Sequence, residues 1–190
     1  DGIGSIGRFL TTDAAGRGYR DADVNPTIFL SNHDTSRVGD FVDVASAPQQ
    51  LMTRHAAVAA YSGPACTYYG DEIGDKSGNG NADNKARTSG RLSDFTANEQ
   101  MVHDYVAKVF KARAENPALW RGTAEKNTQS SSCVKITKTD AATGNKVIVI
   151  FASADSNVSI GGTGTDLING GSVSGSVNVK AWIPAFIRMN

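Results

Sequence analysis

The sequence predicts an α/β part followed by an all-β part, and three observations carry this prediction. In the first half, a β-prone segment, a helical pattern and a second β-prone segment follow one another. After Gly122, apolar residues change from helical spacing to the alternation of antiparallel strands. The composition is globular, with 39% hydrophobic and 20% charged residues among 190. We therefore expect one domain over residues 1–122 and a second over residues 123–190.

The first part is expected to contain two parallel strands joined by a helix. Residues 27–30 form a short apolar run, and residues 65–69 have the pattern of a second buried strand. Between them, Pro48 suits the first turn of a helix that Ser46 can cap, and the Gly-Pro pair within residues 61–64 ends it. A β-α-β order usually gives parallel strands and a right-handed crossover.

A second and longer helix is predicted after a Gly- and Asn-rich loop. Thr96 and Glu99 have the spacing of a capping box, and Asn116-Pro117 ends the helical pattern. One apolar stripe runs along this helix through Met101, Val102, Tyr105, Val106, Val109 and Phe110.

The remainder of the chain predicts a small antiparallel β-sandwich. Val134 and Ile136 alternate with polar residues, residues 143–145 form a turn, and residues 146–151 form a fully buried strand. Further short β-prone runs are centred near Val158, Leu167, Val177 and Phe186.

Charge and composition exclude several classes of function. Lys+Arg and Asp+Glu both number 19, so the chain lacks a basic footprint for nucleic acid or for an anionic membrane. No apolar run is long enough to span a membrane. The even charge and the abundance of Ser, Asn and Gly favour an extracytoplasmic protein. Because the chain starts at Asp1 without an initiator Met or a signal peptide, we expect a processed or excised piece.

Residues 2–7 match the pattern GxGxxG of dinucleotide-binding proteins. That fingerprint requires a preceding strand, and only Asp1 precedes Gly2. We therefore expect a helix end or a loop here and no nucleotide site.

Residues 75–83 place oxygen donors at every second position, as calcium-binding loops do. The twelfth position, however, is Ala86, where such loops carry a bidentate Glu. A solvated Gly/Asn loop is the favoured interpretation. No metal site is assigned, and calcium in this loop is kept as the alternative.

Two polar clusters follow the two predicted strands. Asn32-His33-Asp34 comes after the first strand, and Asp71-Glu72 comes after the second. In parallel α/β architectures the carboxyl ends of the strands share the edge at which sites form. A neutral His beside a carboxylate can hydrogen-bond a hydroxyl or transfer a proton. The sequence thus favours a functional site here over capped loops.

These clusters carry a resemblance to a known family. The segment FLSNHD (29–34) and the segment GPACTYYGDEIG (63–74) are similar to the motifs on barrel strands seven and eight of the alpha-amylase family, glycoside hydrolase family 13. The helix that ends at Asn116-Pro117 and the all-β tail resemble the family's last barrel helix and its C-terminal sandwich. The resemblance implies the C-terminal part of a TIM (β/α)8 barrel, about two βα units, followed by a small antiparallel β-sandwich.

The resemblance also implies roles for individual residues. Asp34 matches the family's transition-state-stabilising carboxylate, and His33 matches the histidine that binds the same sugar. Asn32 would orient the strand end, and Arg37 would pair with nearby carboxylates. Arg87, within residues 83–88, matches an arginine that contacts the neighbouring sugar. The implied partner is an α-glucan or maltooligosaccharide substrate.

The family's nucleophile and acid/base motifs, from strands four and five, are not found in these residues. The chain is therefore expected to be inactive alone. Two parallel strands leave open edges, so we expect the α/β part to pack against a missing N-terminal part of the barrel or against a second copy.

Two alternatives remain open. One is a non-catalytic sugar-binding or interaction module, in which aromatic residues such as Trp182 bind maltooligosaccharide. The other is a transglycosylase or isomerase of the same family, because the motifs present distinguish neither these reactions from hydrolysis nor α-1,4 from α-1,6 bonds.

Overall fold

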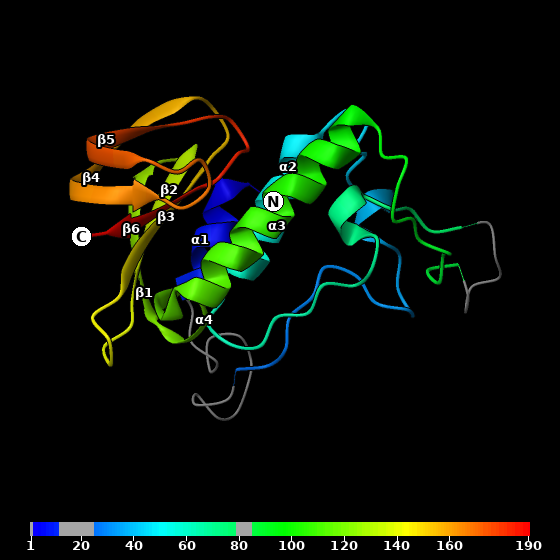
Figure 1. Cartoon of the computed structure of the whole chain (residues 1–190), viewed down its shortest axis with the longest axis horizontal. Helices are drawn as coiled ribbons and strands as arrows, with labels where there is room; N and C mark the ends of the chain where they lie inside the picture. The colour runs from blue at the N-terminus through cyan, green and yellow to red at the C-terminus, as the bar shows by residue number, and fades with distance from the viewer. Residues whose placement is uncertain (1, 12–24, 79–84) are drawn as a thin grey trace.

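The computed structural model describes residues 2–11, 25–78 and 85–190, and it arranges them as helices packed on one side of a β-sheet (Figure 1). None of the helices in these ranges is long and apolar enough to cross a membrane. The α-helices are α1 (Ile3–Thr11), α2 (Pro48–Ala59), α3 (Ala97–Glu115) and α4 (Pro117–Arg121); the 3-10 helices are η1 (Val38–Asp40) and η2 (Asp71–Ile73).

The all-β part is confirmed. Six antiparallel strands form one sheet in the order β1-β2-β3-β6-β4-β5. Strand β1 (Thr123–Ser130) was not predicted, because its sequence, TAEKNTQS, is polar. It lies at the edge of the sheet, where a strand does not need alternating apolar residues. The strands are β1 (Thr123–Ser130), β2 (Cys133–Thr139), β3 (Lys146–Ala152), β4 (Ser156–Asp166), β5 (Ser172–Val179) and β6 (Ala185–Met189).

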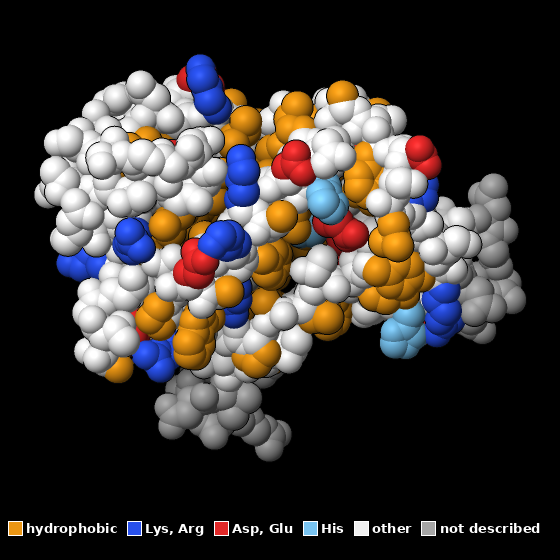
Figure 2. All heavy atoms as spheres, viewed as in Figure 1, with side chains coloured by type: hydrophobic (Ala, Val, Ile, Leu, Met, Phe, Trp, Pro, Cys, Tyr) orange, Lys and Arg blue, Asp and Glu red, His pale blue; other side chains and the backbone are white. Residues whose placement is uncertain are grey.

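The two layers expected of a sandwich come from a single sheet that folds over itself. The pairing of β4 with β5 is interrupted between Ser159 and Thr163, and such irregularities bend a strand. Beyond this point only residues 164–166 of β4 pair with β6. An apolar cluster fills the space between the halves, with Ile148 and Ile150 on β3, Val158 and Ile160 on β4, and Val177 and Val179 on β5. Figure 2 shows that the outer face over β4 and β5 is mostly uncharged polar surface.

The two strands predicted at residues 27–30 and 65–69 reduce to a single parallel bridge between Ile28 and Ala65. The Ile28 amide donates to the Pro64 carbonyl at 3.1 Å, and the Cys66 amide donates to the Ile28 carbonyl at 2.8 Å. The predicted parallel direction is confirmed, but the predicted length is wrong. Extended strands in a parallel sheet depend on neighbours on both sides, and the described residues supply none beyond this pair.

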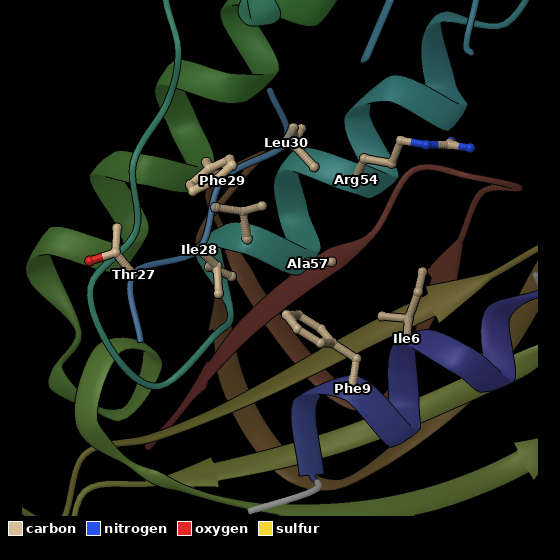
Figure 3. Close-up of a pocket in the computed structure, with 9 residues that line it drawn as sticks. Ile6, Phe9, Thr27, Ile28, Phe29, Leu30, Arg54 and Ala57 are labelled. Atoms are coloured by element: carbon tan, nitrogen blue, oxygen red, sulfur yellow. The ribbon is translucent and has the colours of Figure 1, made fainter. Parts of the chain in front are cut away.

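One face of this parallel pair is open and apolar. A cavity of about 330 Å³ lies between α1, residues 27–30 and α2, and Ile6, Phe9 and Ile28 point toward it (Figure 3). Phe29 is 48% exposed beside it. The apolar side chains on this face are therefore only partly covered within the described residues.

The helix ends test the predicted caps. Helix α2 begins at Pro48, as predicted, but its N-cap is Ala47, so the assignment of Ser46 as the cap is wrong. The Ser46 hydroxyl instead donates to the Asp43 carboxylate at 3.0 Å. The capping box of α3 is confirmed: the Glu99 amide donates to Thr96 Oγ1 at 3.3 Å, and the Thr96 amide donates to the Glu99 carboxylate at 2.7 Å.

Thr96→Ala is expected to lower the free energy of unfolding by about 1 kcal/mol, because the first turn of α3 loses the acceptor for a backbone N–H. Urea denaturation measures the loss. Thr96→Ser keeps the hydroxyl and serves as the control. Equal stability of both variants would contradict a contribution from this cap.

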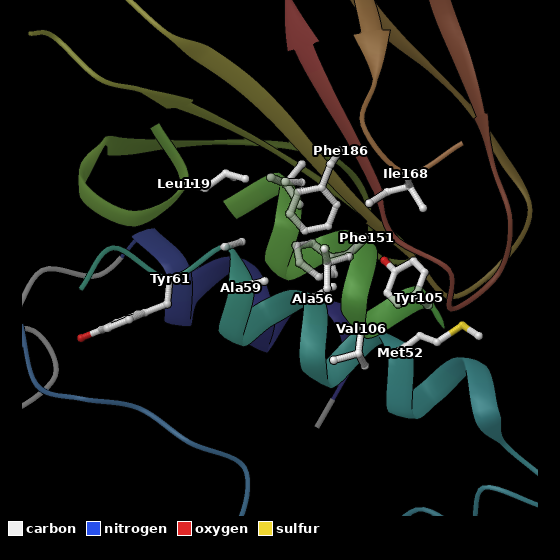
Figure 4. Close-up of a cluster of buried hydrophobic side chains, with 14 of the residues drawn as sticks. Met52, Ala56, Ala59, Tyr61, Tyr105, Val106, Leu119, Phe151, Ile168 and Phe186 are labelled. Carbon is white, nitrogen blue, oxygen red and sulfur yellow. The ribbon is translucent and has the colours of Figure 1, made fainter. Parts of the chain in front are cut away.

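The main core joins the helices to the sheet. Helices α2 and α3 pack side chains such as Met52, Ala56 and Val106 against the face of the sheet that carries Phe151 and Phe186 (Figure 4). Phe151 and Phe186 are both fully buried. A single apolar cluster therefore spans the α/β part and the all-β part.

Most of the GxGxxG segment lies in the first turns of helix α1, as expected of a helix end. Helix α1 packs against β1 and β2. A Cβ at Gly7 would lie 2.9 Å from a methyl of Val134, so the glycine permits the close approach of this helix to the sheet. The motif serves packing.

Candidate functional site

Asn32 organises the turn that follows the bridged strand at Ile28. Its side-chain oxygen accepts hydrogen bonds from the Asp34 amide at 2.8 Å and the Thr35 amide at 3.0 Å. A side chain that caps the amides two and three residues later fixes a tight turn. The next two side chains, His33 and Asp34, consequently project into solvent with exposed fractions of 56% and 68%.

Asp34 lies between His33 and Arg87. Its Oδ2 is 3.2 Å from His33 Nε2, and its Oδ1 is 3.5 Å from Arg87 Nη2. All four predicted site residues are thus brought together, although Arg87 is distant from the others in sequence. Because the carboxylate and both partners are solvated, these contacts are weak and leave Asp34 able to accept hydrogen bonds from a ligand.

Beneath this exposed group lies a buried ion pair, which the sequence predicted only as a contact of Arg37 with carboxylates. Arg37 Nη2 is 3.3 Å from Asp71 Oδ1, and both side chains are almost completely buried. Burial raises the pKa of Asp71 to about 6, while the nearby Ser31 hydroxyl and the charge of Arg37 oppose the rise. Asp71 is therefore enclosed beneath the exposed group and held against Arg37.

The remaining contacts of Arg37 were not predicted. Its guanidinium donates to the Ala86 carbonyl at 3.1 Å, to Thr88 Oγ1 at 3.4 Å and to the Tyr69 carbonyl. The Tyr69 hydroxyl in turn donates to the Thr88 carbonyl at 2.7 Å. Most of these acceptors are backbone carbonyls, which every residue carries, so no sequence pattern indicates them.

His55 supports the same edge from α2. Its Nε2 donates to the Asp71 carbonyl at 3.0 Å, and the ring is fully buried. Burial lowers the pKa of His55 to about 4, so the ring is neutral at ordinary pH. Glu72, the other carboxylate of the second cluster, lines a separate groove with His103 and Phe110 of α3.

The candidate calcium loop is only partly described, since residues 79–83 lie outside the described ranges. Of its donors, the Asp75 carboxylate accepts a hydrogen bond from Thr88 Oγ1. The Ser77 hydroxyl donates to the Asp40 carboxylate at 2.5 Å. Within the described ranges, no three His, Cys, Asp or Glu side chains are grouped to hold a metal ion. In the described part of the loop, these two side chains therefore hydrogen-bond to other residues of the protein.

Comparison with protein-family models and with curated proteins finds no match for this chain. Comparison with solved structures finds many. AmyP in complex with maltose matches 90% of this chain and 42% of its own, at a TM-score of 0.77 and 22% identity. The alpha-amylase from Geobacillus thermoleovorans complexed with acarbose matches 99% of this chain and 42% of its own, at a TM-score of 0.72 and 18% identity. A pullulanase from Anoxybacillus matches 86% of this chain and 27% of its own, at a TM-score of 0.65 and 12% identity.

The chain therefore has the fold found in the C-terminal region of alpha-amylases, α/β followed by all-β. The resemblance indicated by the strand-end motifs is confirmed at the level of the fold. The chain spans less than half the length of each of these enzymes.

Proposed function

We propose that this chain is the C-terminal region of an alpha-amylase-like retaining glycoside hydrolase that acts on α-glucans or maltooligosaccharides. The observation that carries the proposal is the exposed carboxylate of Asp34 between His33 and Arg87. These residues occur in motifs similar to those of the family, on a fold shared with amylases that were solved with maltose and acarbose.

In this proposal Asp34 accepts hydrogen bonds from the hydroxyls of the sugar at the cleavage site. Such bonds accelerate the reaction when they strengthen as the ring distorts toward an oxocarbenium-like transition state. His33 donates to the same sugar, and Arg87 contacts its neighbour. Retaining enzymes also need a nucleophile and an acid/base about 5 Å apart. We assign both to polypeptide outside these 190 residues, which would also cover the apolar face at Ile28.

The test is binding of maltotriose by the chain, followed by NMR. Maltotriose should shift the amide signals of residues 32–35 and 86–88. Asp34→Asn should weaken binding about 10-fold or more, because a hydrogen bond to a charged group contributes about 1.5–3 kcal/mol. Asp104→Asn is the matched control, since Asp104 is also an exposed aspartate beside a histidine, His103, at 3.5 Å. It should leave binding unchanged.

Three outcomes would contradict the proposal. One is an absence of shifts at residues 32–35. Another is binding that survives Asp34→Asn but is lost in Trp182→Ala, which would favour a sugar-binding module instead. The third is release of reducing sugar from soluble starch by the chain alone, lost in Asp34→Asn, which would place a nucleophile within these residues.

A further inference from the structure

We infer that Arg37 is a positioning residue that fixes Arg87 against Asp34, and that sugar binding depends on Arg37 through Arg87. The inference rests on the proposed function for its ligand, a maltooligosaccharide. Its structural part concerns only contacts among described residues.

The guanidinium of Arg37 holds both neighbours of Arg87, one through its backbone carbonyl and the other through its side-chain hydroxyl. One nitrogen, Nη1, donates to the Ala86 carbonyl at 3.1 Å and to Thr88 Oγ1 at 3.4 Å. Ala86 precedes Arg87 and Thr88 follows it. The position of the Arg87 backbone is therefore set by a side chain that belongs to the loop of Asp34.

The same guanidinium is anchored at its other nitrogen. Nη2 contacts the Asp71 carboxylate at 3.3 Å and donates to the Tyr69 carbonyl. The Arg37 amide donates to the Asp40 carboxylate at 2.8 Å, which holds the backbone from which the side chain extends. The Arg37 and Asp71 side chains are almost completely buried, so water competes little for the contact between them.

Gly70 makes this anchor possible. It has φ +83°, and a Cβ at this position would lie 2.8 Å from Arg37 Nη2. A second support holds the same segment, because the Tyr69 hydroxyl donates to the Thr88 carbonyl at 2.7 Å. Both supports converge on the residues that flank Arg87.

The contact between Arg87 and Asp34 is too weak to place Arg87 by itself. It measures 3.5 Å between side chains that are 42% and 68% exposed, and such pairs contribute about 0–1 kcal/mol. The contacts of Arg37 with Ala86 and Thr88 restrain the segment that carries Arg87 in addition to this pair. The planar fork of Arg37 serves several acceptors in fixed directions, which a lysine ammonium does not reproduce.

A double-mutant cycle on the full chain tests the inference. Maltotriose affinity is measured by NMR titration for wild type, Arg37→Lys, Arg87→Gln and the double variant. We expect Arg37→Lys to weaken binding about 5–10-fold when Arg87 is present and less than about 2-fold in the Arg87→Gln background. Equal losses in both backgrounds would show a general structural effect and overturn the inference.

A second readout needs no sugar. The backbone order parameter of the Arg87 amide should be about 0.8 in wild type and fall below about 0.6 in Arg37→Lys. Arg91→Lys, in the same loop, should leave it unchanged. An unchanged order parameter in Arg37→Lys overturns the inference even if maltotriose binds. Absence of sugar binding with a loss of order would instead contradict the proposed function alone.

Thr88→Val provides a variant that keeps the buried Arg37–Asp71 pair intact. It removes one acceptor of Arg37 and the bond from Thr88 to Asp75. We expect the same loss of order at Arg87, at a smaller amplitude. If Arg37→Lys fails to fold, this variant decides the question in the same way.

Discussion

Replacing Arg113 by methionine is expected to lower the free energy of unfolding by about 3–5 kcal/mol. The Arg113 side chain is buried in α3, and no carboxylate accompanies it among its described contacts. A buried carbonyl that loses its donor costs about 1–3 kcal/mol, and several lose it at once. The four acceptors are the carbonyls of Ala59 at 2.9 Å, Tyr61 at 2.6 Å, Leu119 at 3.3 Å and Gly63.

Urea denaturation of the full chain measures this effect. Lys108→Met is the matched control, because Lys108 is a cation on the exposed side of the same helix. Its replacement should change stability by less than about 0.5 kcal/mol. A loss below 1 kcal/mol in Arg113→Met would mean that the freed carbonyls find other donors.

Arg113 has a counterpart in the sheet. Lys138 of β2 donates to the Ala60 carbonyl at 2.5 Å and to the Leu119 carbonyl at 2.9 Å. Both cations therefore meet at the end of α2, where the negative pole of the helix and its free carbonyls attract positive charge. Since one cation comes from the α/β part and the other from the all-β part, this group links the two parts through polar contacts in addition to the shared core.

Local signals made much of this fold predictable. The capping box at Thr96 and Glu99 places the start of α3 by contacts within four residues, and Pro48 does the same for α2. The alternation around Ile136 identifies β2 because one face of that strand is buried. Such signals depend on contacts within one helix or strand. They therefore predict that element correctly whatever the rest of the protein packs against it.

Features that depend on distant backbone were not predictable. Arg113 and Lys138 look like surface residues in sequence, because most of their carbonyl acceptors lie 50 or more residues away. The length of the strand at Ile28 depends on neighbouring strands, and only the bridge to Ala65 forms.

The candidate site also has a part that local sequence predicts and a part that depends on distant residues. Asn32, His33 and Asp34 are adjacent in sequence, and their turn is fixed locally by the Asn32 side chain. The approach of Arg87 instead depends on Arg37, whose guanidinium contacts two separate segments, residues 69–71 and residues 86–88. The resemblance to a family supplied Arg87 as a candidate, and the structure supplies the physical reason for its position.

The buried Lys138 should make stability depend on pH in the alkaline range. Burial, with the nearby charge of Arg113, lowers the pKa of Lys138 from its ordinary value of 10.5 to about 7. Between these two values the unfolded chain keeps the proton that the folded chain has released. The free energy of unfolding therefore rises with pH through this window, by up to about 1.4 kcal/mol per pH unit.

Urea denaturation at pH 7, 8, 9 and 10 measures this slope. Lys138→Met has no group that titrates at this position, so its slope should be lower than that of wild type across the whole window. Other titrating groups are common to both proteins and cancel in the difference. Lys146→Met, at an exposed position at the start of β3, should retain the wild-type slope. Identical slopes for wild type and Lys138→Met would mean that the Lys138 ammonium stays protonated in the folded protein. The carbonyls at the end of α2 would then offset the whole effect of burial on its pKa.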